Sequence, residues 1–548
     1  MANTVTTGKI YPFGGGPWYG VLDTPEPFDD TPQKLQDLLN GYLVDPKGGC
    51  AASGRPGFLK AAPSLTTAGK GQASALWTHT ALDGTVYRFA AVNSKLYRLS
   101  GTNFVTATDV TPVGVAIDNS ITPSSRFYMR SFANTLIFTD GVHRPWIGTN
   151  LGATPITGTY IDIDSAGTTW TSAAAPAEYF GSLFFIVSTY AGAAAVTAGV
   201  GMVWCEPNQP TLGYCQTNYA DFWNLIQQTG QQLGSMKLTA LAATNNSLYY
   251  FREYSIGAVQ GVPSLSFSST ATRDLVSQNV GTTAPGSIAQ FSQNIFFVDA
   301  VGRPFMFTEG GTVTPIWEQL RGQITTTPSM LANPTATAIV GVSCVVPQLN
   351  AVVMSGWTSN AAGVAGGGPL GVGTLYVFAW DTGTYMGRWT GASTLATFDA
   401  IAVMKDPSSN PTFTAFSQDT GLGATIWLQG LLSSTTWQDN SVTVPITATS
   451  SRMGYSGATE WTLQTARAVA GAQTTMDLVT VATNGTVDQG NQTPPASSDG
   501  TYLAQWQPAN VTGRGFQLQL TPTTTTTQWQ LYRMEIDVTG ADVVAGDA

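Results

Sequence analysis

The sequence predicts an all-β protein: a β-propeller with an N-terminal extension before it and a sandwich-like β domain after it. Three observations predict this class. Charged residues make up only 10% of the 548 residues, whereas hydrophobic residues reach 43% and there are 59 glycines. Such a chain, rich in aromatic and turn-forming residues, is typical of strands joined by tight turns. In addition, one hairpin pattern recurs six times, and helical periodicity is scarce.

The recurring hairpin has a short apolar strand, a turn with Asn, Gly or Gln, and a second apolar strand with aromatic residues. The apolar residue after each turn is Leu96, Leu136, Leu183, Leu248, Ile295 or Val352. Propeller blades repeat at a period of ~40–50 residues, and these spacings lie near it. The sequence therefore predicts a six-bladed propeller over residues 70–430, with inserted loops at 149–175 and 189–235. Unrelated hairpins in β-sandwiches are the alternative.

Few segments have helical periodicity. The best candidate runs over 31–43, with a Thr-Pro start and Leu35, Leu38 and Leu39 on one face. A weaker candidate covers 218–233. Both would be short, so helices are a minor part of the expected fold.

The two flanking regions differ from the propeller. Residues 1–69 read as an N-terminal extension, and residues 431–548 as a C-terminal β-rich domain with alternating strands. In the last of these strands, Trp529 and Leu531 would take one face and Arg533 the other. This alternation predicts a sheet with one buried side.

One uncharged stretch, residues 182–204, is long enough to be compared with a membrane span. Gly, Ser and Thr interrupt it, and its flanks are Glu178 and Glu206 rather than basic anchors. A strand, a small-residue loop and a second strand fit it better. The N-terminus also lacks the apolar region of a secretory signal. No membrane insertion is expected.

The charge balance argues against tight nucleic-acid binding. The chain holds 33 acidic and 23 basic residues, for a net charge of −10. No Lys, Arg or His occurs between Pro145 and Met236, and no Lys follows Lys405. Proteins that hold DNA need clustered cations to neutralise phosphates. The low surface charge also predicts that partners cover much of the surface.

The cysteines and histidines do not form a metal motif. Cys50, Cys205, Cys215 and Cys344 make no CxxC pair, and the chain has only two histidines. A Cys/His zinc set is therefore excluded, and no cofactor is predicted. The cysteines are expected to be buried small hydrophobes, with a Cys205–Cys215 bridge as an open alternative.

Catalytic motifs are equally weak. The triplets that begin at Asp381 and Asp419 copy the Asp-Thr-Gly of aspartic proteases, but they lie too close together to come from two lobes. Asp-x-Gly is also a common turn between strands. Residues 164–170 match only half of a sialidase Asp-box. Neither His79 nor His143 stands beside a nucleophile or carboxylate in a catalytic pattern. We therefore expect no enzyme.

The segment over residues 20–58 carries the most distinctive pattern. A proline-containing lead-in precedes an acidic residue, Leu-x-Asn and an aromatic residue, then a Gly-rich gap and Arg-Pro-Gly-aromatic. This order resembles the N-terminal signature of the tail tubular protein B, or tail nozzle, family of short-tailed bacteriophages. The matching positions are Asp37, Leu39, Asn40, Tyr42, Gly48, Gly49, Arg55, Pro56, Gly57 and Phe58.

The resemblance implies an irregular propeller with a β-rich C-terminal part. It also implies a homohexameric ring below the portal and adaptor, which forms part of the channel for genome ejection. Its partners would be copies of itself, the adaptor and tail fibres or spikes, with transient passage of genomic DNA. Such a protein belongs to the virion and is assembled in the host cytoplasm. A glycan-binding or depolymerising propeller, like a tail spike or lectin, is the alternative.

Seven residues of this segment are the candidates for assembly contacts. They are Asp37, Asn40, Tyr42, Arg55, Pro56, Gly57 and Phe58. Proline presets the turn, glycine permits a positive φ, and the aromatic residue would anchor in the first blade. Arg55 would pair with a carboxylate such as Asp37 or reach a neighbouring subunit. An ordinary turn with a solvated arginine is the alternative.

Overall fold

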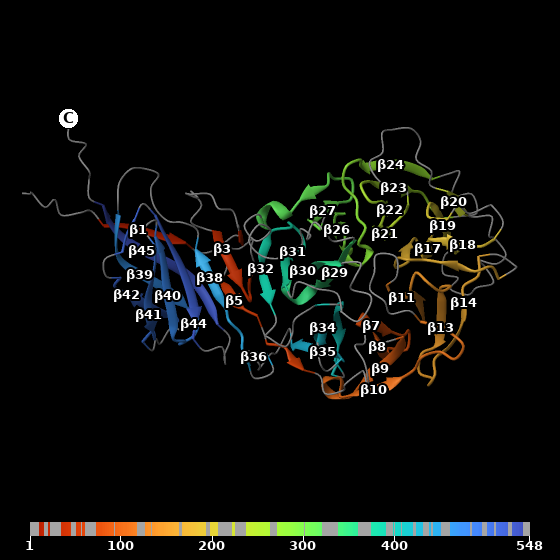
Figure 1. Cartoon of the computed structure of the whole chain (residues 1–548), viewed down its shortest axis with the longest axis horizontal. Helices are drawn as coiled ribbons and strands as arrows, with labels where there is room; N and C mark the ends of the chain where they lie inside the picture. The colour runs from red at the N-terminus through yellow and green to blue at the C-terminus, as the bar shows by residue number, and fades with distance from the viewer. Residues whose placement is uncertain are drawn as a thin grey trace, which may run out of the picture.

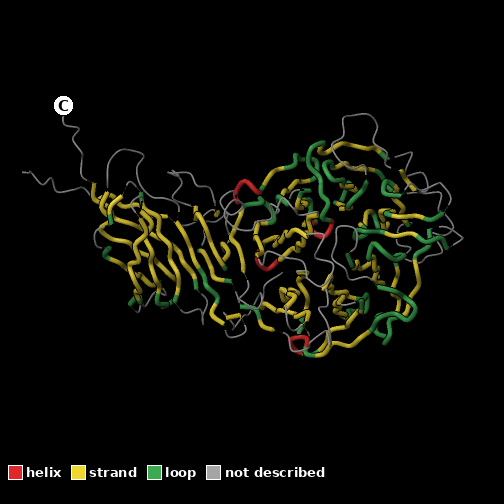
Figure 2. Tube along the Cα trace, in the orientation of Figure 1, coloured by secondary structure: helices red, strands yellow, loops and turns green. Residues whose placement is uncertain are grey.

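The structure is a computed structural model of the whole chain. It describes residues 10–15, 20–21, 34–44, 51–55, 57–60, 73–92, 94–117, 126–132, 134–163, 167–192, 198–205, 222–224, 237–263, 271–300, 302–320, 338–359, 374–390, 398, 400–406, 408–419, 423–430, 438–439, 442–450, 461–482, 485–495, 501–508, 511–513, 515–523 and 529–540. Strands dominate these residues, and the helices among them are short 3-10 turns (Figure 2). The turns are η1 (Thr102–Phe104), η2 (Pro285–Ser287), η3 (Trp317–Leu320) and η4 (Pro347–Leu349).

Seven four-stranded units surround a common axis and form a propeller (Figure 1). Six are separate sheets, and the seventh is part of a larger ten-stranded sheet. The first three blades are β7 (Ala73–Thr80), β8 (Val86–Val92), β9 (Lys95–Ser100), β10 (Thr106–Asp109); β11 (Tyr128–Phe132), β12 (Thr135–Thr139), β13 (Trp146–Asn150), β14 (Thr157–Tyr160); and β16 (Ala177–Tyr179), β17 (Ser182–Val187), β19 (Gly201–Trp204), β20 (Phe222–Asn224).

The next four blades complete the ring. They are β21 (Ala240–Ala243), β22 (Leu248–Phe251), β23 (Ile256–Gln260), β24 (Thr272–Ser277); β25 (Ala289–Phe291), β26 (Asn294–Val298), β27 (Pro304–Thr308), β28 (Thr314–Pro315); β29 (Ala338–Val346), β30 (Ala351–Ser359), β31 (Thr374–Ala379), β32 (Tyr385–Thr390); and β33 (Ala400–Lys405), β34 (Pro411–Asp419), β35 (Gly423–Gly430) with β6 (Leu59–Lys60). Two small pairs lie outside the blades: β15 (Trp170–Thr171) with β18 (Thr189–Tyr190), and β36 (Gln438–Asp439) with β37 (Val442–Thr443).

The ring closes between its last and first blades. The inner strand β33 contacts the inner strand β7. Arg88 of the first blade donates hydrogen bonds to the carbonyl oxygens of Lys405 and Asp406, in the last blade. The outer strand of the last blade is β6, which precedes the propeller in sequence and pairs with β35 through Leu59 and Leu428. N-terminal residues thus supply the fourth strand of the final sheet and pair with Trp427 and Leu428 of β35.

The all-β propeller predicted from the sequence is confirmed, but the blade number is corrected from six to seven. Each of the six hairpins found in the sequence lies in a separate blade. The seventh blade does not fit the hairpin pattern, because the turn of its first hairpin, at 406–410, has the sequence Asp-Pro-Ser-Ser-Asn. In addition, its outer strand comes from the N-terminal region. The expected inserted loops also hold strands: 149–175 contains β14, and 189–235 contains β19 and β20.

The C-terminal domain is a sandwich of two sheets, and it contains N-terminal strands as well. One sheet is β4 (Gly41–Leu43), β5 (Ala52–Gly54), β45 (Gln530–Gly540), β39 (Trp461–Ala470), β42 (Tyr502–Trp506), with β1 (Ile10–Gly15) and β43 (Thr512–Gly513) attached. The other contains β38 (Thr447–Ser450), β44 (Phe516–Pro522), β40 (Met476–Ala482) and β41 (Gly485–Gln492). Buried residues alternate along β39, β40 and β44, as expected for sheets with one buried face.

One strand joins the two domains into a continuous sheet. β3 (Lys34–Leu39), which is paired with β2 (Gly20–Val21), lies between β32 of the sixth blade and β38 of the sandwich. The largest hydrophobic core accordingly contains residues of both domains. In Figure 1, β3 and β5 lie between the ring and the sandwich. N-terminal strand β3 therefore links a sheet of the propeller to a sheet of the sandwich.

The helix predicted over 31–43 is wrong, because its described part forms β3 and β4. Leu35 and Leu38 are both fully buried. A strand normally buries every second residue, but the register of β3 against β38 shifts between Leu35 and Asp37. The extra residue at this bulge places Leu35 and Leu38 on the same buried face, and their spacing is then the one typical of a helix. The second helix candidate contains β20; its remaining residues, 218–221 and 225–233, lie outside the described part of the chain.

The uncharged stretch over 182–204 forms the expected pair of strands. β17 and β19 pair antiparallel, with Phe184 opposite Trp204. Among the described residues, no helix has the length and apolar character needed to cross a membrane.

Candidate functional site

The candidate assembly residues meet where the sixth blade, the seventh blade and the sandwich come together. We call this cluster the junction: Asp37, Asn40, Tyr42, Arg55, Gly57 and Phe58 together with Arg388, Trp389 and Thr390. Pro56, the remaining candidate, lies outside the described residues.

Asp37 lies on β3 and faces Arg388 on β32. The Arg388 Nε and Nη2 atoms donate to the two carboxylate oxygens at 3.2 and 2.8 Å. Burial disfavours the charge on Arg388, but the Asp37 carboxylate and its hydrogen bonds outweigh burial and raise the pKa of the guanidinium. A two-pronged pair of this kind fixes orientation as well as charge. It therefore holds β3 in register against the propeller.

Asn40 occupies the turn between β3 and β4 with a positive φ of 54°. Its backbone N–H donates to the Arg388 carbonyl at 2.6 Å. Its Oδ1 accepts from the Thr390 N–H at 2.7 Å and from Arg55 Nε at 3.2 Å, and its Nδ2 donates to the Pro445 carbonyl at 2.8 Å. Asparagine tolerates the left-handed region better than most residues. One side chain thus bridges Thr390 of the propeller, Arg55 after β5 and Pro445 before β38.

Arg55 is completely enclosed by the protein, with 0% of its surface exposed. Its Nη2 donates to the Thr390 carbonyl at 2.8 Å, and its guanidinium lies 4.8 Å from the centre of the Phe58 ring. Arginine suits this position because its planar group can stack on an aromatic ring and still donate several hydrogen bonds. The buried charge is therefore satisfied within the chain.

Aromatic rings form the apolar side of the junction. Phe58 packs against Phe398 and Phe413 of the seventh blade, with ring centres 6.2 and 6.0 Å apart. Trp389 meets Phe413 edge-on and donates from Nε1 to the Gly41 carbonyl at 3.0 Å. Tyr42 meets Trp389 edge-on, and burial raises the pKa of its hydroxyl. Aromatic contacts of this geometry stabilise a core beyond simple burial.

Glycines let the backbones approach closely here. Gly387 has a φ of +142°, and a Cβ atom on it would lie 2.6 Å from the Gly41 carbonyl oxygen. A Cβ atom on Gly54 would lie 2.5 Å from Ile446 Cδ1. A larger residue at position 387 would push β4 away from the propeller, and one at position 54 would press on the Ile446 side chain, just before β38.

The structure corrects two expectations for this segment. Arg55 neither faces solvent nor reaches a neighbouring subunit, because the chain itself surrounds it. Phe58 anchors in the last blade rather than the first, because β6 follows it directly and pairs with β35. The described candidates do meet, but as contacts within one chain.

Sequence reasoning missed the partners that the propeller supplies. Arg388, Trp389 and Thr390 lie within Tyr-Met-Gly-Arg-Trp-Thr, some 350 residues after Asp37 and Asn40. An arginine beside a tryptophan at the end of a blade strand was the available signal. Nothing local linked it to the N-terminal segment.

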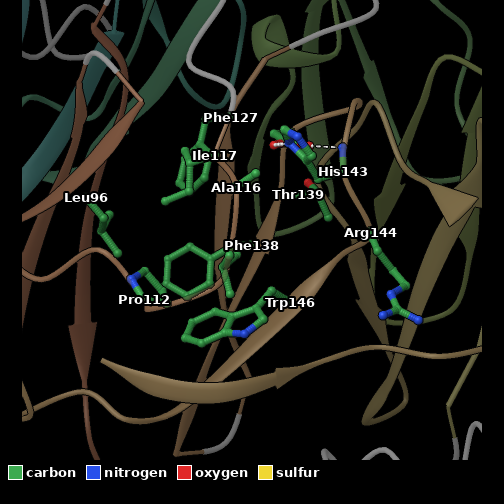
Figure 3. Close-up of a pocket in the computed structure, with 12 residues that line it drawn as sticks. Leu96, Pro112, Ala116, Ile117, Phe127, Phe138, Thr139, His143, Arg144 and Trp146 are labelled. Carbon is green, nitrogen blue, oxygen red and sulfur yellow. Dashed lines mark hydrogen bonds and ion pairs between the residues drawn. The ribbon is translucent and has the colours of Figure 1, made fainter. Parts of the chain in front are cut away.

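A second feature is an apolar pocket between the first and second blades (Figure 3). Its volume is about 320 Å³ when the space open to solvent is counted. Phe127, Phe138 and Trp146 supply aromatic side chains to its lining (Figure 3), and Asp140 and His143 supply polar ones.

The two suspected catalytic triplets lie in different blades. Asp381 lies in the turn between β31 and β32, whereas Asp419 ends β34 in the next blade. His79 lies on β7, and its Nδ1 lies 3.0 Å from the Ser131 hydroxyl. In the part of the chain that the structure describes, no three His, Cys, Asp or Glu side chains form a group able to hold a metal ion.

Comparison with known proteins gives no family. No family model matches the sequence, and no curated protein matches it. Solved structures resemble the chain at low identity. The extracellular domain of the putative one-component system BT4673 from B. thetaiotaomicron is 10% identical, with 88% of this chain and 61% of that chain covered and a TM-score of 0.40. BBS1N, in complex with ARL6DN, is 10% identical, with 69% and 99% covered and a TM-score of 0.38. The Neurospora crassa Pan2 WD40 domain is 9% identical, with 71% and 98% covered and a TM-score of 0.35. With TM-scores below 0.5, these likenesses carry no argument about function.

Proposed function

We propose that this chain is a structural virion protein of a bacteriophage tail, a nozzle or tail-tube component that forms a ring with copies of itself. The observation that carries the proposal is the place of the segment that resembles the nozzle family. Asp37, Asn40, Arg55 and Phe58 of that segment form the junction that ties the propeller to the sandwich. A part that transmits force between tail components has to move as one body.

The charge distribution supports a conduit. A channel for duplex DNA must not hold phosphates, because each neutralised phosphate adds affinity through counterion release. With a net charge of −10, the protein disfavours such contacts. Screening limits the repulsion to about 8 Å at physiological salt, so it acts on DNA near the wall. In this proposal the wall consists mainly of Asp, Glu and neutral side chains.

Electron microscopy of the purified protein, alone and mixed with the adaptor of its phage, tests the proposal. We expect closed rings, homohexameric by the resemblance, that bind the adaptor along the ring axis. Monomers at all concentrations that never bind the adaptor would contradict it.

The alternative, a glycan-binding or depolymerising propeller, needs exposed aromatic platforms. Most tryptophans whose burial the structure describes are buried instead: Trp146, Trp170, Trp204, Trp389, Trp461, Trp506 and Trp529. This burial favours a core role. Incubation with host surface polysaccharide discriminates the two, because binding or cleavage would support the alternative.

A further inference from the structure

The chain contains only two histidines, and both lie at the boundary between the first and second blades. His79 is on β7, the inner strand of the first blade, and faces Ser131 on β11, the inner strand of the second. His143 lies in the turn between β12 and β13, at the edge of the pocket formed by the same two blades. We call this boundary the histidine seam.

His79 is enclosed, with 0% of its surface exposed. Trp77 Nε1 donates to the Ser131 hydroxyl oxygen at 2.8 Å, and the same oxygen lies 3.0 Å from His79 Nδ1. An indole nitrogen is only a donor, so the Ser131 hydroxyl hydrogen is free to bond Nδ1 of a neutral imidazole. The His79 ring also stacks on Tyr87, with ring centres 6.4 Å apart.

The other ring nitrogen of His79, Nε2, is buried and makes no hydrogen bond with the residues that the structure describes. With Nδ1 accepting from Ser131, the hydrogen of the neutral ring stands on Nε2. A second proton would have to go on Nδ1, which faces the Ser131 hydroxyl oxygen that already accepts from Trp77. It would also place a positive charge inside an enclosed site. Tyr87 is the titratable group stacked on the ring, and burial is the sole cause that lowers the pKa of His79.

His143 has the opposite environment. Its Nδ1 lies 2.7 Å from the Asp140 carboxylate, and its side chain is 34% exposed. The neighbouring Arg144 pairs with Asp162 at 2.5 Å. The seam thus holds one histidine that is enclosed and one that is partly exposed beside a carboxylate.

We propose that the histidine seam is an acid-sensitive element: protonation of His79 opens the contact between β7 and β11 while the other blade contacts stay closed. The proton comes from solvent, binds the neutral imidazole more tightly in the open form, and so shifts the equilibrium towards the open seam. The inference is independent of the proposed function.

The direction with pH follows from linkage. The pKa of His79 is lower in the closed seam than its ordinary value of about 6.5. The open form therefore binds the extra proton more readily. The seam keeps its full stability above about pH 6.5 and loses it as pH falls towards the lower pKa of the closed form. One proton changes the open population by up to about tenfold per pH unit in this window.

Hydrogen exchange followed by mass spectrometry tests the proposal, with rates corrected for intrinsic exchange. Between pH 6.5 and 5.5 we expect the opening of β7 and β11 to rise by up to about tenfold in the wild type. His79→Gln should abolish this rise, and His143→Gln, the matched control, should retain it. An equal rise in the wild type and His79→Gln, or a rise spread over all blades, would overturn the proposal.

If His79→Gln does not fold, imidazole NMR of the wild type decides. Two histidines give two sets of signals, and His143→Gln identifies the second. We expect a His79 midpoint below 6.5 and linked to the exchange of β7. A midpoint at or above 6.5 would overturn the proposal.

Discussion

Arg55→Ala is the sharpest perturbation of the junction. The arginine has no exposed surface and donates to Asn40 Oδ1 at 3.2 Å and to the Thr390 carbonyl at 2.8 Å. Its removal leaves the Thr390 carbonyl without that donor and opens space above Phe58. The variant should therefore loosen the contact between the propeller and the sandwich.

The magnitude follows from these two bonds. Hydrogen bonds from a charged donor contribute ~1.5–3 kcal/mol each. We take the lower value for both bonds, because the alanine variant also removes the cost of burying the charge. The expected loss in the free energy of unfolding is therefore ~3 kcal/mol. Arg533→Ala is the control: its side chain is 51% exposed and pairs with Glu535, and we expect a loss below ~1 kcal/mol.

Urea denaturation followed by tryptophan fluorescence measures both variants. The wild type should unfold in one transition, because both domains share one hydrophobic core. Arg55→Ala should unfold at lower urea, with the sandwich and the propeller beginning to separate. If Arg55→Ala and Arg533→Ala lose the same stability, the junction does not hold the domains together and this reasoning is refuted.

Further predictions concern the same contacts and the conduit. Phe58→Ala should lower the free energy of unfolding by ~3–5 kcal/mol, because a buried ring is replaced by a cavity; a loss below ~1 kcal/mol in urea denaturation would contradict it. Asp37→Asn should lower it by ~1–3 kcal/mol, because the bidentate pair with Arg388 loses its charge; unchanged stability in the same assay would count against the pair. Gly387→Ala should lower the free energy of unfolding by ~1–3 kcal/mol, because its φ of +142° and the close approach to Gly41 strain any larger residue. A melting temperature equal to that of the wild type would exclude this strain. Duplex DNA should not shift in a gel with the protein at physiological salt, and micromolar binding would exclude a repelling wall.

The repeated hairpins were predictable because each is local. Leu96, Leu136, Leu183 and Leu248 follow their turns directly, and each hairpin forms within its own blade. The sequence pattern of one hairpin does not depend on distant residues. This local character makes the fold class predictable from the sequence.

The errors concern features that depend on distant residues. The seventh blade takes its outer strand from Leu59 and Lys60, which belong to another part of the sequence. The bulge at β3 spaces Leu35 and Leu38 as a helix would. At the junction, the signature residues were found, but Arg388 was not, because its pairing with the N-terminal segment exists only in the folded chain.

A reconstruction of the assembled particle by cryo-electron microscopy, at a resolution that shows side chains, tests the central claim most directly. We predict a closed ring in which residues 34–60 of each subunit join its own propeller to its own sandwich, around a lumen lined mainly by Asp, Glu and neutral side chains. A particle that forms no ring, or one with a lumen rich in Lys and Arg, would contradict the account.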